Sequence, residues 1–275
     1  DLAGHSAGGR TLMLAAAKPA PVQICGLGWF DTTGLSGMDY FLTDRICDPL
    51  GLHEAYFKER LLRVPGGPFC YTPPKMVSRP GQLHDKIVFG CFNNFAKITD
   101  DMLSCWLKIL RRVPGARLIL QDTTLLRQRQ ARLWARAEKL GFRADELELR
   151  LGVMDYMKCY LDVDIALDTF PYTGGVTTCD ALYMGVPVVV LAGRRHGERI
   201  GLSLLTQLGL EDLAAVSQDE YIDKAVRLAE DKRRLVELRR GLRDRMCTSL
   251  LMDAKTYVYG LEQAYETVWQ EWLKD

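Results

Sequence analysis

The sequence predicts an α/β fold built on a doubly wound parallel sheet, on the basis of three observations. From residue 86 onward, short apolar segments alternate with longer segments of helical periodicity. Residues 186–191 are mostly valine, which is typical of a strand buried on both faces. Gly141 and Gly185 directly follow helical segments, and a glycine in that place commonly ends a helix.

In chain order, the strands of this sheet are expected at 87–92, 116–120, 147–151, 165–167 and 186–191. The intervening helices are expected at 99–113, 126–140, 155–161 and 177–184. Thr99 is the expected N-cap of the first helix, because two aspartates follow it where the helix dipole favours acids.

The last third of the chain is expected to be helical. Residues 218–245 carry charges at helical spacing, which indicates solvated helix faces. Near the C-terminus, apolar residues recur at the spacing of one helix face, and we expect this stripe to pack on the body of the domain, with a partner-binding face as the alternative. The stripe consists of Leu261, Tyr265, Val268 and Trp272.

The first 85 residues differ from the rest because they are rich in Gly and Pro and lack long helical patterns. Strands are expected here at 21–29, 39–43 and 61–64, followed by a linker at 70–85. We therefore divide the chain at residue 86 into two parts, 1–85 and 86–275.

Composition restricts the classes of partner. The 36 basic and 35 acidic residues give a net charge of +1, so charge provides no reason to expect nucleic acid or a membrane surface. No apolar run reaches the ~18 residues of a membrane span, and no signal peptide is visible. The eight cysteines form no CxxC pair, which favours reduced thiols and a cytoplasmic location. Because the chain begins with Asp1, we expect it to be a piece of a longer protein.

The segment with the most chemical potential follows the strand expected at 165–167 and opens the next helix. Two glycines would let a phosphate approach the backbone, the helix start offers free N–H groups, and two threonines add hydroxyl donors. An aspartate in the first turn could accept hydrogen bonds from ribose hydroxyls. A simple loop with a capping threonine is the equally weighted alternative. These residues are Gly174, Gly175, Thr177, Thr178 and Asp180.

Other candidates follow strands or lie in glycine-rich loops. Lys97, in a loop after the strand at 87–92, could neutralise a diphosphate, with Asn93 and Asn94 nearby to cap or bind; a solvated loop lysine is the alternative. His5 is a conceivable general base, although a lone loop histidine is more often structural. His196 and Arg199 follow the strand at 186–191, where ligand contacts and structural roles are equally supported. No metal-binding motif is visible.

Several segments together resemble one known family. The strings DLAGHSAGGR, LGWFDTTGLSGMDYFLTD, FGCFNNFAKIT and DIALDTFPYTGGVTTCDALYMGVPVVVLAG are similar to the catalytic region of the protein O-GlcNAc transferase and Spindly family, in order along almost the whole chain. The resemblance implies a GT-B architecture with two Rossmann-like lobes. Residues 1–85 would be a remnant of the N-terminal catalytic lobe with a linker. Residues 86–275 would be the C-terminal nucleotide-sugar-binding lobe with C-terminal helices.

The resemblance also implies roles for individual residues. Lys97 matches the lysine that contacts the donor diphosphate and stabilises the leaving group. The residues expected to bind the donor nucleotide are Asn94, Tyr156, Gly174, Gly175, Thr177, Thr178 and Asp180. The residues expected in the sugar pocket are His5, Arg10, Leu27, Gly28 and Phe30.

The reaction implied is metal-free, inverting transfer of a sugar, most simply GlcNAc from UDP-GlcNAc, to Ser or Thr hydroxyls of acceptor proteins. Family members usually select these acceptors through upstream tetratricopeptide repeats. GDP-fucose remains an alternative donor, because residues 70–73 and the 173–179 loop are at least as similar to Spindly. A Rossmann oxidoreductase is disfavoured, since no GxGxxG follows a strand with an acid about 20 residues later.

Four departures from the family pattern concern the donor site. Phe30-Asp31 replaces a Pro-Gly pair, Val176 stands where a threonine is common, Tyr156 lies near the place of a histidine, and Gln121 replaces a basic residue. They leave open a degenerate, non-catalytic homologue that binds nucleotide sugars. The family's N-terminal-lobe histidines would precede Asp1, so we expect weak or no transferase activity from this chain alone.

Overall fold

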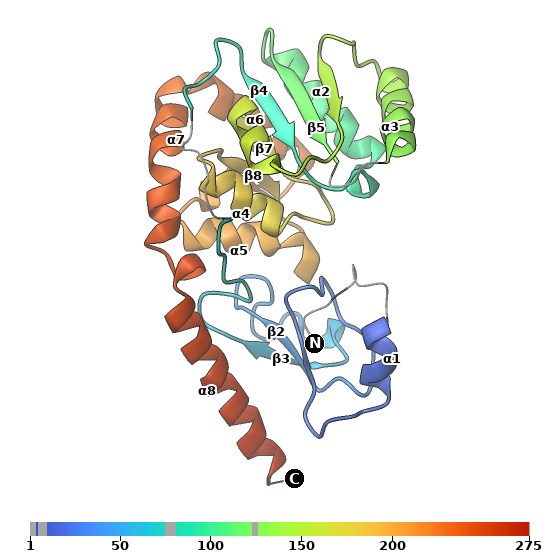
Figure 1. Ribbon diagram of the computed structural model, residues 1–275, viewed down its shortest axis with the longest axis vertical. Helices are drawn as coiled ribbons and strands as arrows, with labels where there is room; N and C mark the ends of the chain where they lie inside the picture. The colour runs from blue at the N-terminus through green and yellow to red at the C-terminus, as the bar shows by residue number, and fades with distance from the viewer. Residues whose placement is uncertain (1–3, 5–9, 75–80, 123–125, 275) are drawn as a thin grey trace.

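The computed structural model describes residues 4, 10–74, 81–122 and 126–274, with the backbone alone considered at residue 10. These residues form two lobes, each built on a parallel sheet (Figure 1). The lower lobe in that view holds a three-stranded sheet, and the upper lobe holds a six-stranded sheet. We call them the small lobe and the large lobe.

The large lobe has the strand order β6-β5-β4-β7-β8-β9, in which the chain runs outward in both directions from β4, as a doubly wound sheet requires. All neighbouring strands are parallel. The predicted α/β class is therefore confirmed. The strands are β4 (Val88–Cys91), β5 (Arg117–Gln121), β6 (Leu147–Arg150), β7 (Ile165–Leu167), β8 (Val188–Leu191) and β9 (Ala214–Ala215).

Helices cover the sheet of the large lobe. They are α2 (Asp100–Arg112), α3 (Arg127–Leu140), α4 (Val176–Tyr183), α5 (Ile200–Gln207), α6 (Gln218–Glu230) and α7 (Lys232–Cys247), with 3-10 turns η3 (Phe95–Lys97), η4 (Tyr156–Asp162), η5 (His196–Glu198), η6 (Glu211–Leu213) and η7 (Leu250–Met252). The expected N-cap is confirmed, because the Thr99 hydroxyl accepts a hydrogen bond from the Met102 amide at 3.2 Å. Gly141 ends α3 in the left-handed region, at φ +100°.

The small lobe contains α1 (Arg10–Ala16), β1 (Ile24–Cys25), β2 (Tyr40–Thr43), the 3-10 turn η2 (Glu54–Tyr56) and β3 (Arg60–Arg63). The three strands are parallel in the order β1-β2-β3. The strand expected at 21–29 is much shorter than predicted, because its second half forms the Gly26–Trp29 turn. The buried core of this lobe is small and consists, among the described residues, of Ala15, Cys25, Trp29, Met38 and Phe41.

Buried polar side chains join the two lobes. The Asp48 carboxylate of the small lobe accepts from Nδ1 of His196 in the large lobe at 2.7 Å and from Nδ1 of His53 at 2.8 Å. Asp44 accepts from the Ser203 hydroxyl across the same boundary. Because Asp48 is fully buried, these contacts fix the position of one lobe against the other.

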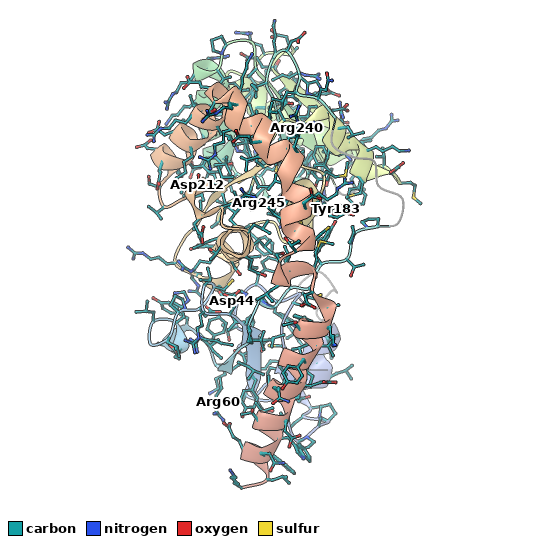
Figure 2. All side chains as sticks on the ribbon, turned by 90° about the vertical axis from the view of Figure 1, so that its left-hand side faces the viewer. Asp44, Arg60, Tyr183, Asp212, Arg240 and Arg245 are labelled. Atoms are coloured by element: carbon teal, nitrogen blue, oxygen red, sulfur yellow. The ribbon has the colours of Figure 1, made fainter. Side chains whose placement is uncertain are left out.

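The final helix, α8 (Ala254–Trp272), leaves the large lobe and runs along the small one (Figure 1). Figure 2 shows α7 and α8 as one column of helix, with Asp44 at the level where the lobes meet and Arg60 beside the lower half of α8. Arg60 pairs with Glu271 at 2.9 Å, and the Tyr257 hydroxyl donates to the Pro68 carbonyl at 3.0 Å.

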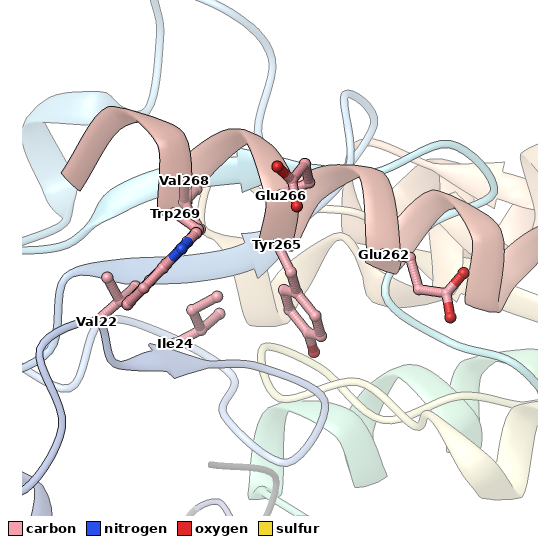
Figure 3. A pocket seen from close by; sticks show the side chains of 7 residues that line it. All are labelled: Val22, Ile24, Glu262, Tyr265, Glu266, Val268 and Trp269. Carbon is pink, nitrogen blue, oxygen red and sulfur yellow. The ribbon is translucent and has the colours of Figure 1, made fainter. Parts of the chain in front are cut away.

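The predicted apolar stripe of α8 is only half correct. Leu261 and Val268 face the protein, but Tyr265 and Trp272 are 45% and 42% exposed, because the packed face is rotated toward Ala264 and Glu271. Tyr265, Val268 and Trp269 of α8 border a groove of about 650 Å³ between α8 and β1 (Figure 3). The groove is lined by Val22, Ile24, Glu262, Tyr265, Glu266, Val268 and Trp269. None of the described helices is long and apolar enough to cross a membrane.

Candidate functional site

The candidate site lies at the carboxyl ends of β4 and β7, where ligands bind to doubly wound sheets. Lys97 ends the short turn after β4 and is largely buried. Its Nζ donates to Oδ1 of Asn93 at 3.2 Å and to the carbonyl of Thr173 at 2.9 Å. Burial lowers the pKa of Lys97, and the nearby Asp168 carboxylate opposes that shift. The lysine is thus a fixed cation at the end of the sheet.

Asp168 organises the loop opposite Lys97. Its Oδ1 accepts from the backbone amides of Gly174 and Thr169, both at 2.8 Å, and from Nδ2 of Asn93 at 3.2 Å. Burial raises the pKa of Asp168, while Lys97 and the backbone donors counteract the rise. The carboxylate therefore holds the glycine loop and the asparagine in one arrangement.

Helix α4 begins immediately after this loop. Gly175 is its N-cap and has no side chain to satisfy the first amides, so N–H groups at the helix start remain for a ligand. A side chain at Gly174 would meet Asp168 and both threonine hydroxyls below 3.0 Å, so this position needs glycine. The Thr177 hydroxyl donates to Asn93 Oδ1 at 3.2 Å, which brings it to the oxygen that also binds Lys97.

Asp180 lies one turn further along α4 and is buried. The Tyr71 hydroxyl donates to its Oδ1 at 2.7 Å and the Tyr156 hydroxyl to its Oδ2 at 3.0 Å. Burial raises its pKa and the two tyrosine hydrogen bonds act against the rise. Because a carboxylate oxygen can accept more than one hydrogen bond, the two tyrosines leave acceptor capacity on Asp180 for a ligand hydroxyl.

A pocket of about 700 Å³ opens beside Asp180, between α4 and the loops after β5 and β6. Its walls are mostly apolar, with polar groups at Thr177, Asp180 and Gln121, which is the composition of small-molecule sites. The lining residues are Phe92, Gln121, Asp122, Gly152, Val153, Met154, Tyr156, Val176, Thr177 and Asp180.

The small lobe contributes the loop after β1. Leu27 has a φ of +49° and, with Phe30, packs against the core of the large lobe. Gly4 lies so close to the Gly28 carbonyl that any side chain there would overlap it. A second hollow, of about 370 Å³, lies where Phe30 and Asp31 meet Tyr172 and Arg195. Of the expected sugar-pocket residues, Leu27 and Phe30 thus face the large lobe, and Gly28 lies between them in the same loop.

Two predicted sugar-pocket residues cannot be placed. His5 lies outside the described residues. Arg10 begins α1, but its side chain is not among the described atoms. Their suggested roles therefore remain predictions.

For His196 and Arg199, the structure supports the structural alternative. His196 is 2% exposed, bonded to Asp48 and packed edge-on against Phe41 at 4.9 Å, so it joins the lobes. Arg199 donates to the Ile46 carbonyl at 2.8 Å and serves the same boundary. Asn94 caps the turn before Lys97, accepting from the Ala96 amide and from Arg129, each at 2.9 Å, so its Oδ1 is already engaged.

Sequence reasoning missed residues that the fold brings to the site. Thr173 holds Lys97 together with Asn93, which the sequence had marked only as a residue that could cap or bind, and Tyr71 binds Asp180 from 109 positions away in the chain. Asp168, at the end of a predicted strand, had the one usable signal: a carboxylate directly before a glycine-containing loop. Among the described residues, no three His, Cys, Asp or Glu side chains cluster in a way that could hold a metal ion.

Two parallel-sheet lobes, with a lysine, a helix start and a pocket at the strand ends of the large lobe, are the features that define the class of this protein. The structure aligns with the Thermobaculum terrenum O-GlcNAc transferase mutant K341M with a TM-score of 0.91 and 36% identity, covering 100% of this chain and 53% of that one. The fold is therefore that of the GT-B glycosyltransferases.

The family follows from the sequence comparisons. The model of glycosyl transferase family 41 matches residues 1–79 and 78–261, and the chain belongs to this family. It is 40% identical over 285 residues to the Arabidopsis thaliana protein named "Probable UDP-N-acetylglucosamine--peptide N-acetylglucosaminyltransferase SPINDLY", covering 100% of this chain and 31% of that protein. It is 31% identical to the A. thaliana protein of the same description named SEC, over 98% of this chain and 29% of that protein. The chain thus spans less than a third of these relatives.

Proposed function

We propose that this chain binds UDP-GlcNAc and that the whole protein transfers GlcNAc, with inversion, to Ser or Thr hydroxyls of proteins. The names of its relatives support the donor and the peptide acceptor. Membership of family 41 supports glycosyl transfer. Tetratricopeptide repeats before this chain and a cytoplasmic location remain predictions from the family resemblance.

The observation that carries the proposal is the position of Lys97 beside the N-terminus of α4. A Lys ammonium has three donors, of which Asn93 and Thr173 occupy two. Among the described residues, the third donor has no recorded acceptor, so it is free for a diphosphate oxygen. The leaving diphosphate gains negative charge as the sugar bond breaks. A lysine already fixed in place, together with the α4 amides, stabilises that charge without reorganising.

The remaining parts of the site fit the rest of the donor. The Asp180 carboxylate suits the ribose hydroxyls, and the apolar walls at Phe92 and Val153 suit a nucleobase. Phe30 and Leu27 of the small lobe border the side where the sugar would lie. We further propose that the donor binds without a metal, since Lys97 and the helix start supply the positive charge.

Calorimetric titration of the chain with UDP, GDP and uridine tests the proposal, using the wild type, Lys97→Met and Lys224→Met. Lys97→Met keeps the apolar stem of the side chain but removes the charge. It should weaken UDP binding about 10- to 100-fold, as expected for the loss of a charged hydrogen bond. Uridine, which lacks the diphosphate, should bind both proteins equally. EDTA should leave UDP affinity unchanged.

Lys224→Met removes an amine from α6 that donates to the Asp212 carbonyl, and it should bind UDP like the wild type. Equal UDP affinity in the wild type and Lys97→Met would contradict the role of Lys97. A preference for GDP would replace the proposed UDP-GlcNAc donor by GDP-fucose. Failure of the folded wild type to bind any of the three ligands would contradict nucleotide-sugar binding.

A further inference from the structure

Two aromatic rings lie beside the ammonium of Lys97, in addition to its two hydrogen-bond acceptors. Nζ lies 4.1 Å from the centroid of the Tyr172 ring and 5.7 Å from that of Phe30. The two rings stack on each other with centroids 4.4 Å apart and planes inclined by 24°. Lys97 thus contacts a continuous aromatic surface as well as two oxygen acceptors.

The rings come from different lobes. Phe30 belongs to the loop after β1 in the small lobe, and Tyr172 belongs to the loop after β7 in the large lobe. The Phe30 loop also docks closely on η5 of the large lobe, because a side chain on Gly197 would approach the Phe30 carbonyl to 2.6 Å. Next to the stack, Asp31 pairs with Arg195 at 2.7 Å. The aromatic stack is therefore part of the contact between lobes.

An aromatic face suits this position for a physical reason. A ring attracts a cation through its quadrupole. Unlike an oxygen acceptor, it does not take up the N–H donor of Lys97 that a diphosphate oxygen would bind. It also excludes water from the ammonium, which strengthens the attraction to an anion. The groups that face Lys97 are Asn93, the Thr173 carbonyl, the two rings, and the titratable Asp168 and Cys91. Asp168 is already engaged by backbone amides, so the rings add contact to the ammonium without a further charged partner.

We propose that Tyr172 is a positioning residue for Lys97, and that Phe30, stacked behind it, couples the position of Lys97 to the docking of the two lobes. The ring face of Tyr172 holds the ammonium against Asn93 and Thr173 with its third donor directed away from the ring. The inference rests on the proposed function of Lys97 as the diphosphate-binding cation, and it adds a specific role for two residues that do not themselves bind the diphosphate.

The test is titration with UDP and uridine of Tyr172→Leu, Tyr172→Phe and Phe30→Leu, beside the wild type and Lys97→Met. Tyr172→Leu removes the ring but stays apolar, and it should weaken UDP binding about 2- to 30-fold, the range of a cation–ring contact. Tyr172→Phe keeps the ring and should bind UDP like the wild type. Phe30→Leu should show a smaller loss in the same direction. Uridine affinity should be equal in all of them.

The second readout is the pH dependence of UDP binding. Losing the ring makes the buried ammonium easier to deprotonate, so UDP affinity of Tyr172→Leu should decline at a lower pH than that of the wild type or Tyr172→Phe. Tyr40→Leu is the matched control, because it removes a ring beneath Arg60, 5.0 Å away, at the far side of the small lobe. It should leave both UDP affinity and its pH profile unchanged.

The outcomes separate this inference from the proposed function. If Lys97→Met weakens UDP binding but Tyr172→Leu behaves like the wild type, the positioning role is wrong and the role of Lys97 stands. If Tyr172→Leu or Tyr172→Phe loses uridine binding as well, Tyr172 supports the pocket as a whole, and the inference is again overturned. If Lys97→Met binds UDP like the wild type, the proposed function fails first.

Discussion

Trp106 of the large lobe and Trp29 of the small lobe are both buried, but their surroundings differ. Trp106 sits in a continuous apolar core that extends across the sheet, and its Nε1 donates to the Tyr221 hydroxyl at 3.1 Å. Trp29 belongs to a core of few residues beneath three short strands. The large lobe is stabilised from within, whereas the small lobe depends on its attachments to the large lobe and to α8.

This difference matters for the site, because Lys97, Asn93 and Asp168 all belong to the large lobe, while Phe30 comes from the small one. Tyr221 links the core of the large lobe to the site, since its hydroxyl accepts from Trp106 and donates to the Asp168 carbonyl at 3.0 Å. The nucleotide half of the site, formed by these large-lobe residues, should therefore be as stable as the core of the large lobe. The sugar half, to which Phe30 belongs, should be only as stable as the contact between lobes.

Substitution of the two tryptophans should have the largest effect on the stability of the lobes. Trp106→Ala should lower the free energy of unfolding by about 3–5 kcal/mol and also weaken UDP binding, because it leaves a large cavity under the sheet. Trp29→Ala should expose mainly the small lobe. Hydrogen exchange followed by mass spectrometry checks this: protection should be lost at 38–43 and kept at 88–91 in Trp29→Ala. Equal loss in both strands would contradict a large lobe that is stabilised from within.

Asp48→Ala should break the attachment between the lobes. It leaves the buried His196 and His53 nitrogens without their acceptor, which costs about 1–3 kcal/mol for each unsatisfied group. Denaturant unfolding measures this change, with Asp145→Ala as a control at an exposed pair. UDP affinity should fall only slightly, as in Phe30→Leu, because the residues that bind the nucleotide belong to the large lobe and the docking of the lobes acts on Lys97 only through Phe30. An unchanged unfolding midpoint would show that the buried carboxylate does not hold the lobes together.

Acid should act through the same carboxylate. Burial alone would raise the pKa of Asp48, but hydrogen bonds from His196, Thr43 and His53 bring it below its usual value. A lowered pKa contributes stability above the unfolded-state value of about 3.9, and this contribution is lost as the pH falls through the lower folded-state value. As the pH falls below about 4, wild type should therefore lose more stability than Asp48→Asn. Parallel declines in the two proteins would contradict this reading.

The smallest expected effect is at α8. Glu271→Ala removes the exposed pair with Arg60 and the hydrogen bond from the Tyr40 hydroxyl at 3.1 Å. Exposed pairs contribute about 0.2–1 kcal/mol, so thermal unfolding should shift only slightly. A loss as large as that of Asp48→Ala would mean that α8, and not the buried carboxylate, is the main attachment of the small lobe.

Much of the large lobe could be predicted from local patterns. The valine-rich strand at 188–191, the Thr99 cap and the glycine that ends α3 each depend on interactions within a few residues. The small lobe was less predictable, because its strands are short and its stability comes from distant contacts. The aromatic residues of α8 show the limit: their helical spacing is right, but which side faces the protein depends on how the small lobe packs.

The site divides in the same way. Lys97, Thr177 and Asp180 lie at strand ends and a helix start, so sequence position alone indicated them. Tyr71 and Phe30 reach the site through tertiary contacts, and nothing in their local sequence marks a partner on another lobe. For His196 the sequence left a ligand contact and a structural role equally open, because its position after a strand does not reveal that it binds Asp48 in the interior.

The most direct test of the account is a crystal structure of the chain with UDP bound. We expect the diphosphate to lie between Lys97 Nζ and the first amides of α4, with the ribose hydroxyls bound to Asp180 and the base in the pocket beside Phe92. UDP bound elsewhere, for example in the groove between α8 and β1, or with its diphosphate turned away from Lys97, would contradict it.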